Sequence, residues 1–407
     1  MTETPQANSK FIIKNLKLIF GLGLFFLAAW SPLYAQDDAP AAKPAAHWFF
    51  LDLGAKYVGW DTNSALGYPD NGMEILAPLT FSATPWKDFR FYGQTEYAVG
   101  HYTDSVSGSP ETFNLSHLTD SVLGLEANFN SFSLPSLVNI GFNIPTGDPT
   151  WELKQTSSIV PTEFIDGDYR GRGFGMSFLY GLSLPAGGAQ YGVAAGYMYS
   201  GAFNPYFGQG TTANQLKLGD SAFLSLNRAA THGGDQNDII RVSVFYFLST
   251  QQDSAPLLQM GPNVNASYSW NNPKALSFEV GGQYFLPEQK SNNGQQLSPE
   301  AFNSLGARFY LNPSYAFGNL TVAARLKYVL ANGYPQSDSV NYDGGGYLAG
   351  LEPTYLFKLD ANSSLKISAG YDYVLWKNVA KDQLNPSDRV NFEYGRWTFG
   401  THYEVGL

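Results

Sequence analysis

The chain has no cysteine among its 407 residues, and it carries little charge. Without cysteine there is no disulfide, no thiolate nucleophile and no cysteine-ligated zinc site. Lys, Arg, Asp and Glu together make up only 14% of the residues, and acids outnumber bases to give a net charge of −10. Because affinity for nucleic acid rests on Lys and Arg against phosphate, we expect no nucleic-acid partner.

Long apolar runs are missing beyond the N-terminal segment. Leu18 to Trp30 is an uninterrupted apolar run after a basic stretch, and it is shorter than the roughly 20 residues that a spanning helix needs. This pattern predicts a cleaved signal peptide at residues 1–35, cut near Ala35, and a Pro/Ala-rich linker at residues 36–46. An uncleaved anchor helix is the alternative. An exported chain without a later apolar helix is either soluble or a β-barrel.

Aromatic residues, at 15%, are abundant, and apolar residues recur at every second position. In residues 320–330 the even positions are apolar, while Thr321, Arg325 and Lys327 lie between them. The same period of two occurs in residues 275–286, 347–357 and 365–375. Such alternation predicts β-strands with one apolar face. The runs have about the length of a tilted membrane-spanning strand, roughly 9–11 residues.

Short polar turns and longer polar links follow one another along the chain. This order is typical of an up-and-down barrel with brief turns on one side of the membrane and extended loops on the other. We therefore predict an all-β fold for residues 47–407, a transmembrane up-and-down antiparallel β-barrel of about 16 strands. Alternation is poor in residues 220–232, which leaves 14 strands as the alternative.

The polar face of the predicted strands carries charge in mid-strand, which a packed interior would reject and a water-filled lumen accepts. The basic lumen candidates are Arg90, Arg241, Arg308, Arg325, Lys327 and Arg396, and the acidic ones are Glu96, Glu126, Glu279 and Glu352. Lys56, Lys366, Asp52, Glu74, Asp372 and Glu404 share this face. Each of them could instead form a structural ion pair. Bases and acids nearly balance, so no strong ion preference follows, although Arg325 and Lys327 predict a local basic patch.

The segment 145–173 has no period of its own and is the longest link. Loops of this length are uncommon unless they are functional or disordered. Its acidic residues are Asp148, Glu152, Glu163, Asp166 and Asp168. It is the third long link, between the fifth and sixth predicted strands. A surface loop that only covers the barrel mouth is the alternative to a functional one.

From Trp48 to Leu407 the chain resembles the bacterial outer-membrane porin-like barrels. The last segment, 397–407, alternates like their C-terminal assembly signal, although it ends in Leu407 where Phe is usual. The resemblance implies an outer-membrane location, contact with lipid and lipopolysaccharide, recognition by the barrel-assembly machinery through residues 397–407, and a homotrimer. It also implies a third loop that folds into the pore. The run Ile144 to Asp148 is similar to a strand end in putative outer-membrane transporters associated with aromatic-compound degradation.

Catalytic and metal-binding patterns are missing from the sequence. The five histidines form no His-x-x-x-His spacing, so zinc is unsupported. Gly219 to Ala222 is similar to the nucleophile block of an esterase family, but the Asp-x-x-His that this family needs does not occur, so Ser221 lacks a general base. We expect no enzyme activity, no metal and no cofactor.

The sequence therefore predicts a channel for passive diffusion of small polar solutes, narrowed by the loop 145–173. Rings of charge around such a constriction tune which ions pass. An outer-membrane transporter of hydrophobic or aromatic compounds is one alternative, and it would need an apolar inner track that the charged lumen positions disfavour. A non-conducting surface barrel, an adhesin or scaffold, is the other.

Overall fold

A computed structural model gives the fold of most of the chain after residue 47. The described residues are 48–63, 71–104, 111–147, 173–204, 215–217, 219–233, 235–252, 255–259, 261–286, 289–292, 295–296, 305–332, 344–380 and 389–406. The predicted signal peptide and linker, residues 1–46, lie outside these ranges, as do Asp148, Glu152, Glu163, Asp166 and Asp168. Among the described residues, no helix is long and apolar enough to cross a membrane.

Sixteen antiparallel strands form one continuous sheet, which is the wall of the barrel. Its strands are β1 (Phe49–Asn63), β2 (Asn71–Trp86), β3 (Phe89–Asp104), β5 (Ser121–Ser131), β6 (Leu134–Ile144), β7 (Gly175–Ala186), β8 (Ala189–Ser200), β11 (Ser221–His232), β12 (Gln236–Phe247), β15 (Asn263–Asn271), β16 (Leu276–Phe285), β19 (Leu305–Phe317), β20 (Leu320–Asn332), β21 (Gly344–Lys358), β22 (Ser363–Ala380) and β23 (Arg389–Gly406). The further strand β4 (Glu111–Leu118) pairs with one half of β3 and β5 with the other half, so β4 and β5 together occupy one wall position.

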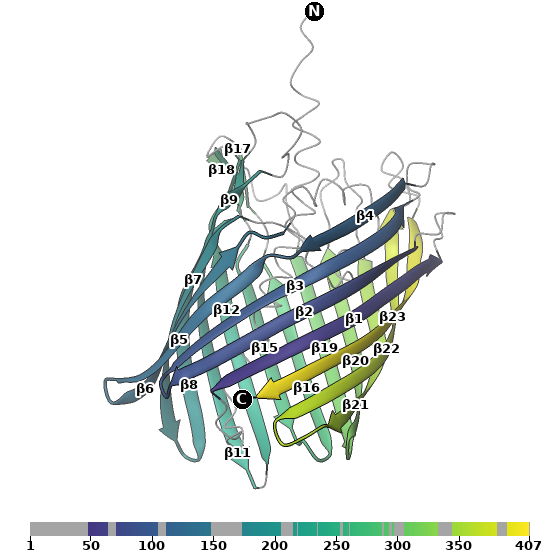
Figure 1. Ribbon diagram of the computed structural model, residues 1–407. Helices are drawn as coiled ribbons and strands as arrows, with labels where there is room; N and C mark the ends of the chain where they lie inside the picture. The colour runs from purple at the N-terminus through teal and green to yellow at the C-terminus, as the bar shows by residue number, and fades with distance from the viewer. Residues whose placement is uncertain are drawn as a thin grey trace, which may run out of the picture.

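The wall closes on itself between the first and last strands. β1 pairs with β2 on one side and with β23 on the other, in a register from Phe50 opposite Gly406 to Asn63 opposite Glu393. Figure 1 shows the tilted strands running around the closed barrel. A closed barrel has no sheet edge, so its backbone groups can all be paired without water, as a bilayer requires. The expected transmembrane up-and-down barrel is confirmed, with 16 strands and not 14.

Apolar side chains alternate outward around the whole wall. The exposed large apolar residues include Leu224, Val242, Val280, Phe309, Leu326, Tyr347, Leu351, Ile367, Trp397 and Phe399. Soluble proteins rarely expose a continuous apolar surface of this extent. In a bilayer the same side chains are removed from water, which stabilises each one by about 1.5–3 kcal/mol. Their neighbours in sequence point to the opposite, inner face, because successive strand residues alternate.

Short turns join the strands at one end of the barrel, as expected from the sequence. One example is the two-residue turn at Gly187 and Gly188, whose φ angles of 59° and 79° suit a tight hairpin. The C-terminal end of β23 lies at this end (Figure 1). Brief turns face the periplasm in barrels of this kind, so the longer links mark the outer end.

The strands are longer than the sequence pattern predicts. β1 to β3 and β21 to β23 run for 15 to 18 residues each, against the 9–11 expected from the alternation. Part of the segments interpreted as polar links is therefore strand. The alternation reports only the band in contact with hydrocarbon, whereas the hydrogen-bonded strand pairing continues beyond that band.

The strand that alternates poorly, β11, is an ordinary member of the wall. It pairs with β8 over ten positions from Ser221 to Ala230 and with β12 along its whole length. Its alternation is weak because Phe223 faces inward and Arg228 faces outward, the reverse of the usual polarity. Both exceptions contribute to sites described below.

Six short strands continue one side of the wall beyond the outer end, forming a second small sheet (Figure 1). They are β9 (Ala202–Phe203), β10 (Leu216–Lys217), β13 (Thr250–Gln252), β14 (Ala255–Gln259), β17 (Gln289–Asn292) and β18 (Gln295–Gln296). In chain order, these strands precede or follow the wall strands β8, β11, β12, β15, β16 and β19, so the small sheet prolongs this side of the barrel.

Candidate functional site: the lumen and the root of its longest loop

All ten lumen candidates lie on the inner face of the wall, opposite in parity to the outward apolar side chains. They are Arg90 and Glu96 on β3, Glu126 on β5, Arg241 on β12, Glu279 on β16, Arg308 on β19, Arg325 and Lys327 on β20, Glu352 on β21 and Arg396 on β23. The strand order distributes them around the barrel. Which of them meet is decided by register, which no local sequence pattern gives.

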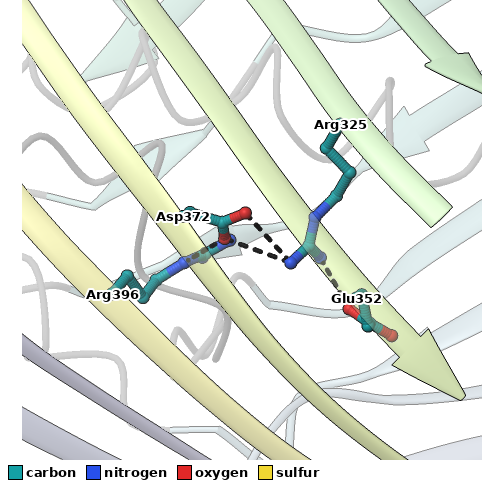
Figure 2. Close-up of polar contacts among 4 residues, drawn as sticks. All are labelled: Arg325, Glu352, Asp372 and Arg396. Carbon is teal, nitrogen blue, oxygen red and sulfur yellow. Dashed lines mark hydrogen bonds and ion pairs between the residues drawn. The ribbon is translucent and has the colours of Figure 1, made fainter. Parts of the chain in front are cut away.

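Four of the inward charges form one connected network across β20 to β23. Arg325 Nη1 lies 3.0 Å from Glu352 Oε2, and Arg325 Nη2 lies 3.0 Å from Asp372 Oδ1. Arg396 Nη2 approaches the other oxygen of Asp372 at 2.6 Å. Figure 2 shows Arg325 between the two acids, with Arg396 reaching Asp372 from the opposite side. Arg325 is therefore engaged by two carboxylates, and the local basic patch expected from Arg325 and Lys327 stays a prediction.

The network is buried at one end and wet at the other. The side chains of Asp372 and Arg396 are 0% and 7% exposed, whereas those of Arg325 and Glu352 are 30% and 28% exposed. The buried half is the part whose charges depend most on each other, because no water replaces a lost partner. The exposed half meets the space inside the barrel.

A glycine makes room for this network. Gly350 stands opposite both Arg325 and Asp372 in the register of its two neighbouring strands. A Cβ at this position would lie 1.8 Å from Asp372 Oδ1, closer than any real contact. The carboxylate therefore occupies the space that a side chain would fill. Next to it, Pro353 lacks an N–H, and the β21–β22 pairing skips from Leu351 to Thr354. The ion pairs cross the wall beside this interruption.

Other inward polar groups also meet across strands. Lys366 and Glu404 form an ion pair at 2.5 Å, and Lys366 is 42% exposed. Tyr310 donates a hydrogen bond to Glu279 at 2.9 Å, and Tyr92 donates one to Asn139 at 3.0 Å. The inner face therefore carries polar contacts between different strands, and the charged pair Lys366–Glu404 is partly exposed.

The opposite wall, from β6 to β12, is more apolar inside than expected. A cavity of about 440 Å³ opens there, within the range of small-molecule sites, roughly 300–1,000 Å³. Its apolar lining includes Leu137, Leu179, Met198, Phe223 and Phe245. The rings of Phe223 and Phe245 stack with their centroids 5.4 Å apart. The expectation that the lumen lacks an apolar track is wrong for this side of the barrel. Phe223 belongs to β11, the strand that alternates poorly, and its ring faces the lumen instead of the lipid.

Charged and amide groups border this apolar surface. Arg90, Glu126, Asn139, Asn227 and Arg241 line the same cavity. Arg90 stands directly opposite Glu126 in the pairing of β3 with β5. The cavity therefore combines a polar side and an apolar side within one compartment.

The root of the loop 145–173 is held by a polar cluster, the loop-root clamp, made of Thr119, Asp120, Asn143 and Thr146. Asp120 accepts hydrogen bonds from the Gly147 N–H at 2.9 Å and from Asn143 Nδ2 at 2.8 Å. The same Asn143 amide donates to the Gly173 carbonyl at 3.1 Å. Thr146 donates its hydroxyl to the Thr119 carbonyl. Both ends of residues 148–172 are thus attached to one cluster.

The clamp lies on the lumen side of the wall. Asn143 pairs with Val122, which lines the cavity, so its side chain faces inward. At the far end of the loop, Gly173 has a φ of 79°, and a Cβ there would lie 2.6 Å from the Ala202 carbonyl oxygen. Only glycine tolerates both conditions. The clamp was not found from the sequence, because Asp120 and Asn143 belong to no motif and are 23 residues apart.

The segment that is similar to an esterase block, Gly219 to Ala222, has a structural role at the outer end of the barrel, where β11 begins. Asp220 accepts hydrogen bonds from the Tyr197 hydroxyl at 2.7 Å and from the Ser200 N–H at 3.0 Å. Lys217 Nζ lies 3.1 Å from the same carboxylate. Ser221 is almost fully buried. In the described residues, no group of three or more His, Cys, Asp or Glu side chains is placed to hold a metal ion.

The fold defines the class of protein. A closed barrel of 16 antiparallel strands with an apolar outer face and a charged inner face is a transmembrane β-barrel of the bacterial outer-membrane type. The expected outer-membrane location agrees with this fold, a closed barrel with an apolar outer face.

No known family model matches the chain, and no curated protein matches it. Among solved structures it is similar to Pseudomonas aeruginosa OccK7 (OpdD), at 12% identity over 89% of this chain and 100% of that one, with a TM-score of 0.44. It is also similar to a loop L8 deletion mutant of OmpT, an outer membrane protein of Vibrio cholerae, at 14% identity over 88% of this chain and 98% of the other, with a TM-score of 0.41. A third is a mutant of the TodX monoaromatic hydrocarbon channel, at 10% identity over 91% and 93%, with a TM-score of 0.40. These likenesses concern the barrel fold and carry no argument about cargo.

Proposed function

We propose that the protein is an outer-membrane channel through which small polar solutes diffuse passively. The observation that carries this proposal is the set of partly exposed charges inside a closed wall, Lys366, Arg325 and Glu352. A packed core would bury and neutralise such groups, because an unpaired charge away from water costs far more than an exposed one. Partly exposed cations on the inner face therefore indicate that water fills the lumen.

The loop 145–173 is the proposed constriction of this channel. Support comes from the loop-root clamp, which holds both ends of the loop on the lumen side. A loop rooted there needs no long path to reach the pore axis. Its acids would face inward bases such as Arg90 and Arg241, and charges on opposite sides of a constriction set size limits and ion preference.

Assembly is proposed to follow the usual route for such barrels. β23 carries outward Trp397, Phe399 and Tyr403 and closes the wall against β1, and it is the segment through which the barrel-assembly machinery would recognise the chain. A homotrimer is the assembly that the porin resemblance implies, and the mass of the detergent-solubilised protein tests it.

The protein reconstituted in a planar bilayer should give stable conductance steps. We expect weak selectivity between K⁺ and Cl⁻, because inward acids and bases are nearly balanced. The control is the same preparation denatured by heat before addition, which should give none. A correctly folded barrel that stays electrically silent would reject the channel and support the scaffold alternative.

The apolar lining on β6 to β12 favours a second candidate, a route for aromatic or other apolar compounds. If these compounds slide along it, Phe223→Ser should lower their permeation into liposomes about threefold or more, the loss expected when one aromatic contact is removed. Permeation of a neutral sugar should stay the same. The outward Tyr347→Ser, on the far side of the wall, is the matched control. Equal permeation of aromatic solutes in all three proteins would remove this candidate.

A further inference from the structure

An outward-facing ion pair stands near the short-turn end of β11 and β12. Arg228 and Asp238 lie on the same face as the lipid-facing Leu226 and Ile240, two residues away on each strand. Arg228 Nη1 lies 3.1 Å from both carboxylate oxygens of Asp238. Charge on the outer face of a barrel costs most at the bilayer midplane and little at the interfaces. The pair therefore needs an interfacial position.

Its height fits the headgroup region of the inner leaflet. Arg228 is four residues before the end of β11, and Asp238 is the third residue of β12. At a rise of about 3.3 Å per residue and a tilt of about 40°, Arg228 stands only about 10 Å above the turn. Tyr191 stands opposite Arg228, and Trp270 opposite Asp238, in the registers of β8 and β15. Tyr and Trp mark the membrane–water interface.

The pair leaves hydrogen-bonding capacity toward the membrane. A guanidinium has five N–H donors. Asp238 engages only Nη1, and the Tyr191 hydroxyl is a second partner of the guanidinium, so donors are left over after both contacts. The Arg228 side chain is 33% exposed. His232 Nε2 lies 3.5 Å from Asp238, its side chain is 43% exposed, and its ring centroid is 5.2 Å from that of Trp270. We call these five residues, Tyr191, Arg228, His232, Asp238 and Trp270, the Arg228 rim.

A second ion pair adjoins the Arg228 rim at the turns. Lys274 Nζ lies 3.0 Å from Asp235 Oδ2, and both side chains are largely exposed. Together the rim and this pair present two fixed cations and two carboxylates at the short-turn end of the barrel. A ligand with one phosphate and one ammonium group matches this arrangement better than a purely anionic one, because each of its charges meets an opposite charge.

We propose that the Arg228 rim binds the headgroup of a phospholipid that carries both a phosphate and an ammonium group. Arg228 and His232 receive the phosphate, for which the guanidinium geometry is suited. The carboxylates of Asp238 and Asp235 receive the ammonium group. The rings of Tyr191 and Trp270 lie against the glycerol region. This inference rests on the barrel lying in a membrane and not on what its pore carries.

Native mass spectrometry of the intact protein tests this inference. The protein is released from nanodiscs of phosphatidylethanolamine and phosphatidylglycerol in equal amounts. Wild type should keep bound phosphatidylethanolamine. The double variant Arg228→Gln/Asp238→Asn removes both charges without leaving either one unpaired, and it should lose this adduct by about tenfold, as expected for one lost charge-assisted hydrogen bond. Lys358→Gln, an exposed cation at another short turn, should keep it.

The outcomes separate the inference from the channel function. Equal retention by wild type and the double variant would overturn it, as would equal retention of phosphatidylglycerol. Thermal unfolding in detergent provides a second readout, in which dihexanoyl-phosphatidylethanolamine should raise the midpoint of wild type only. The same rise with inorganic phosphate alone would also overturn it. Conductance of the double variant should equal that of wild type, so a silent channel and a lost lipid are independent failures.

Discussion

Excision of Thr150 to Asp166 should raise the single-channel conductance roughly two- to threefold, the change expected when a loop no longer narrows the pore. The deletion retains Thr146, Gly147 and Gly173, so the loop-root clamp keeps its contacts. It removes the acids Glu152, Glu163 and Asp166. Because the excision removes these negative charges from the pore, the channel should also shift toward anions. Single-channel recordings in KCl, with the reversal potential in a salt gradient, measure both effects.

Clamp variants provide a graded comparison for the excision. Asp120→Ala removes the acceptor for the Gly147 N–H and for the Asn143 amide, so the loop should lose one of its two anchors. We expect noisier steps and a conductance between those of wild type and the excision. Asp235→Ala, at a short turn of the opposite end, is the control. Unchanged conductance after the excision would reject the constriction and leave a loop that only covers the mouth.

Asp372→Ala should be the most destabilising single change in the charge network, costing about 3–5 kcal/mol because it leaves the buried Arg396 guanidinium without its carboxylate. Glu352→Ala should cost about 1 kcal/mol or less, because Glu352 and Arg325 are both partly exposed and water replaces the lost contact. Urea unfolding of the barrel in lipid vesicles, followed by tryptophan fluorescence, measures the difference.

A rescue variant separates charge from shape. Asp372→Leu combined with Arg396→Met replaces the buried pair with apolar side chains, and it should recover much of the lost stability because no buried charge stays unpaired. Asp372→Asn alone should behave like Asp372→Ala. If Asp372→Ala and Glu352→Ala lower the free energy of unfolding by the same amount, burial of Asp372 and Arg396 does not strengthen their ion pair, and water reaches that pair.

The wall was predictable because its signal is local. Alternation in segments such as 320–330 reports which face meets hydrocarbon, and turns such as Gly187-Gly188 report where strands reverse. β11 was the weak point of the strand count, since Phe223 and Arg228 invert its polarity. Each inversion has a partner elsewhere: Phe223 stacks on Phe245 inside the barrel, and Arg228 pairs with Asp238 outside.

The contacts within the candidate site were not predictable from local patterns. Arg325, Glu352, Asp372 and Arg396 come from four strands, and a shift of one residue in any register would turn a side chain to the other face. Gly350 reads in the sequence as one of many glycines, yet it stands where the Asp372 carboxylate needs its space. The loop-root clamp was equally unpredictable from the sequence, because it joins the two residues between β4 and β5 to the end of β6.

The sequence alone determined that every second side chain faces lipid, that the chain folds into an antiparallel barrel, and that charges such as Arg325 and Glu352 face its interior. These follow from the two-residue period of a strand, which needs no knowledge of neighbours. The tertiary structure decided which charges pair, where the inner wall turns apolar, and where both ends of the loop 145–173 are held. These depend on strand register and closure, because they join residues that only the folded wall brings together.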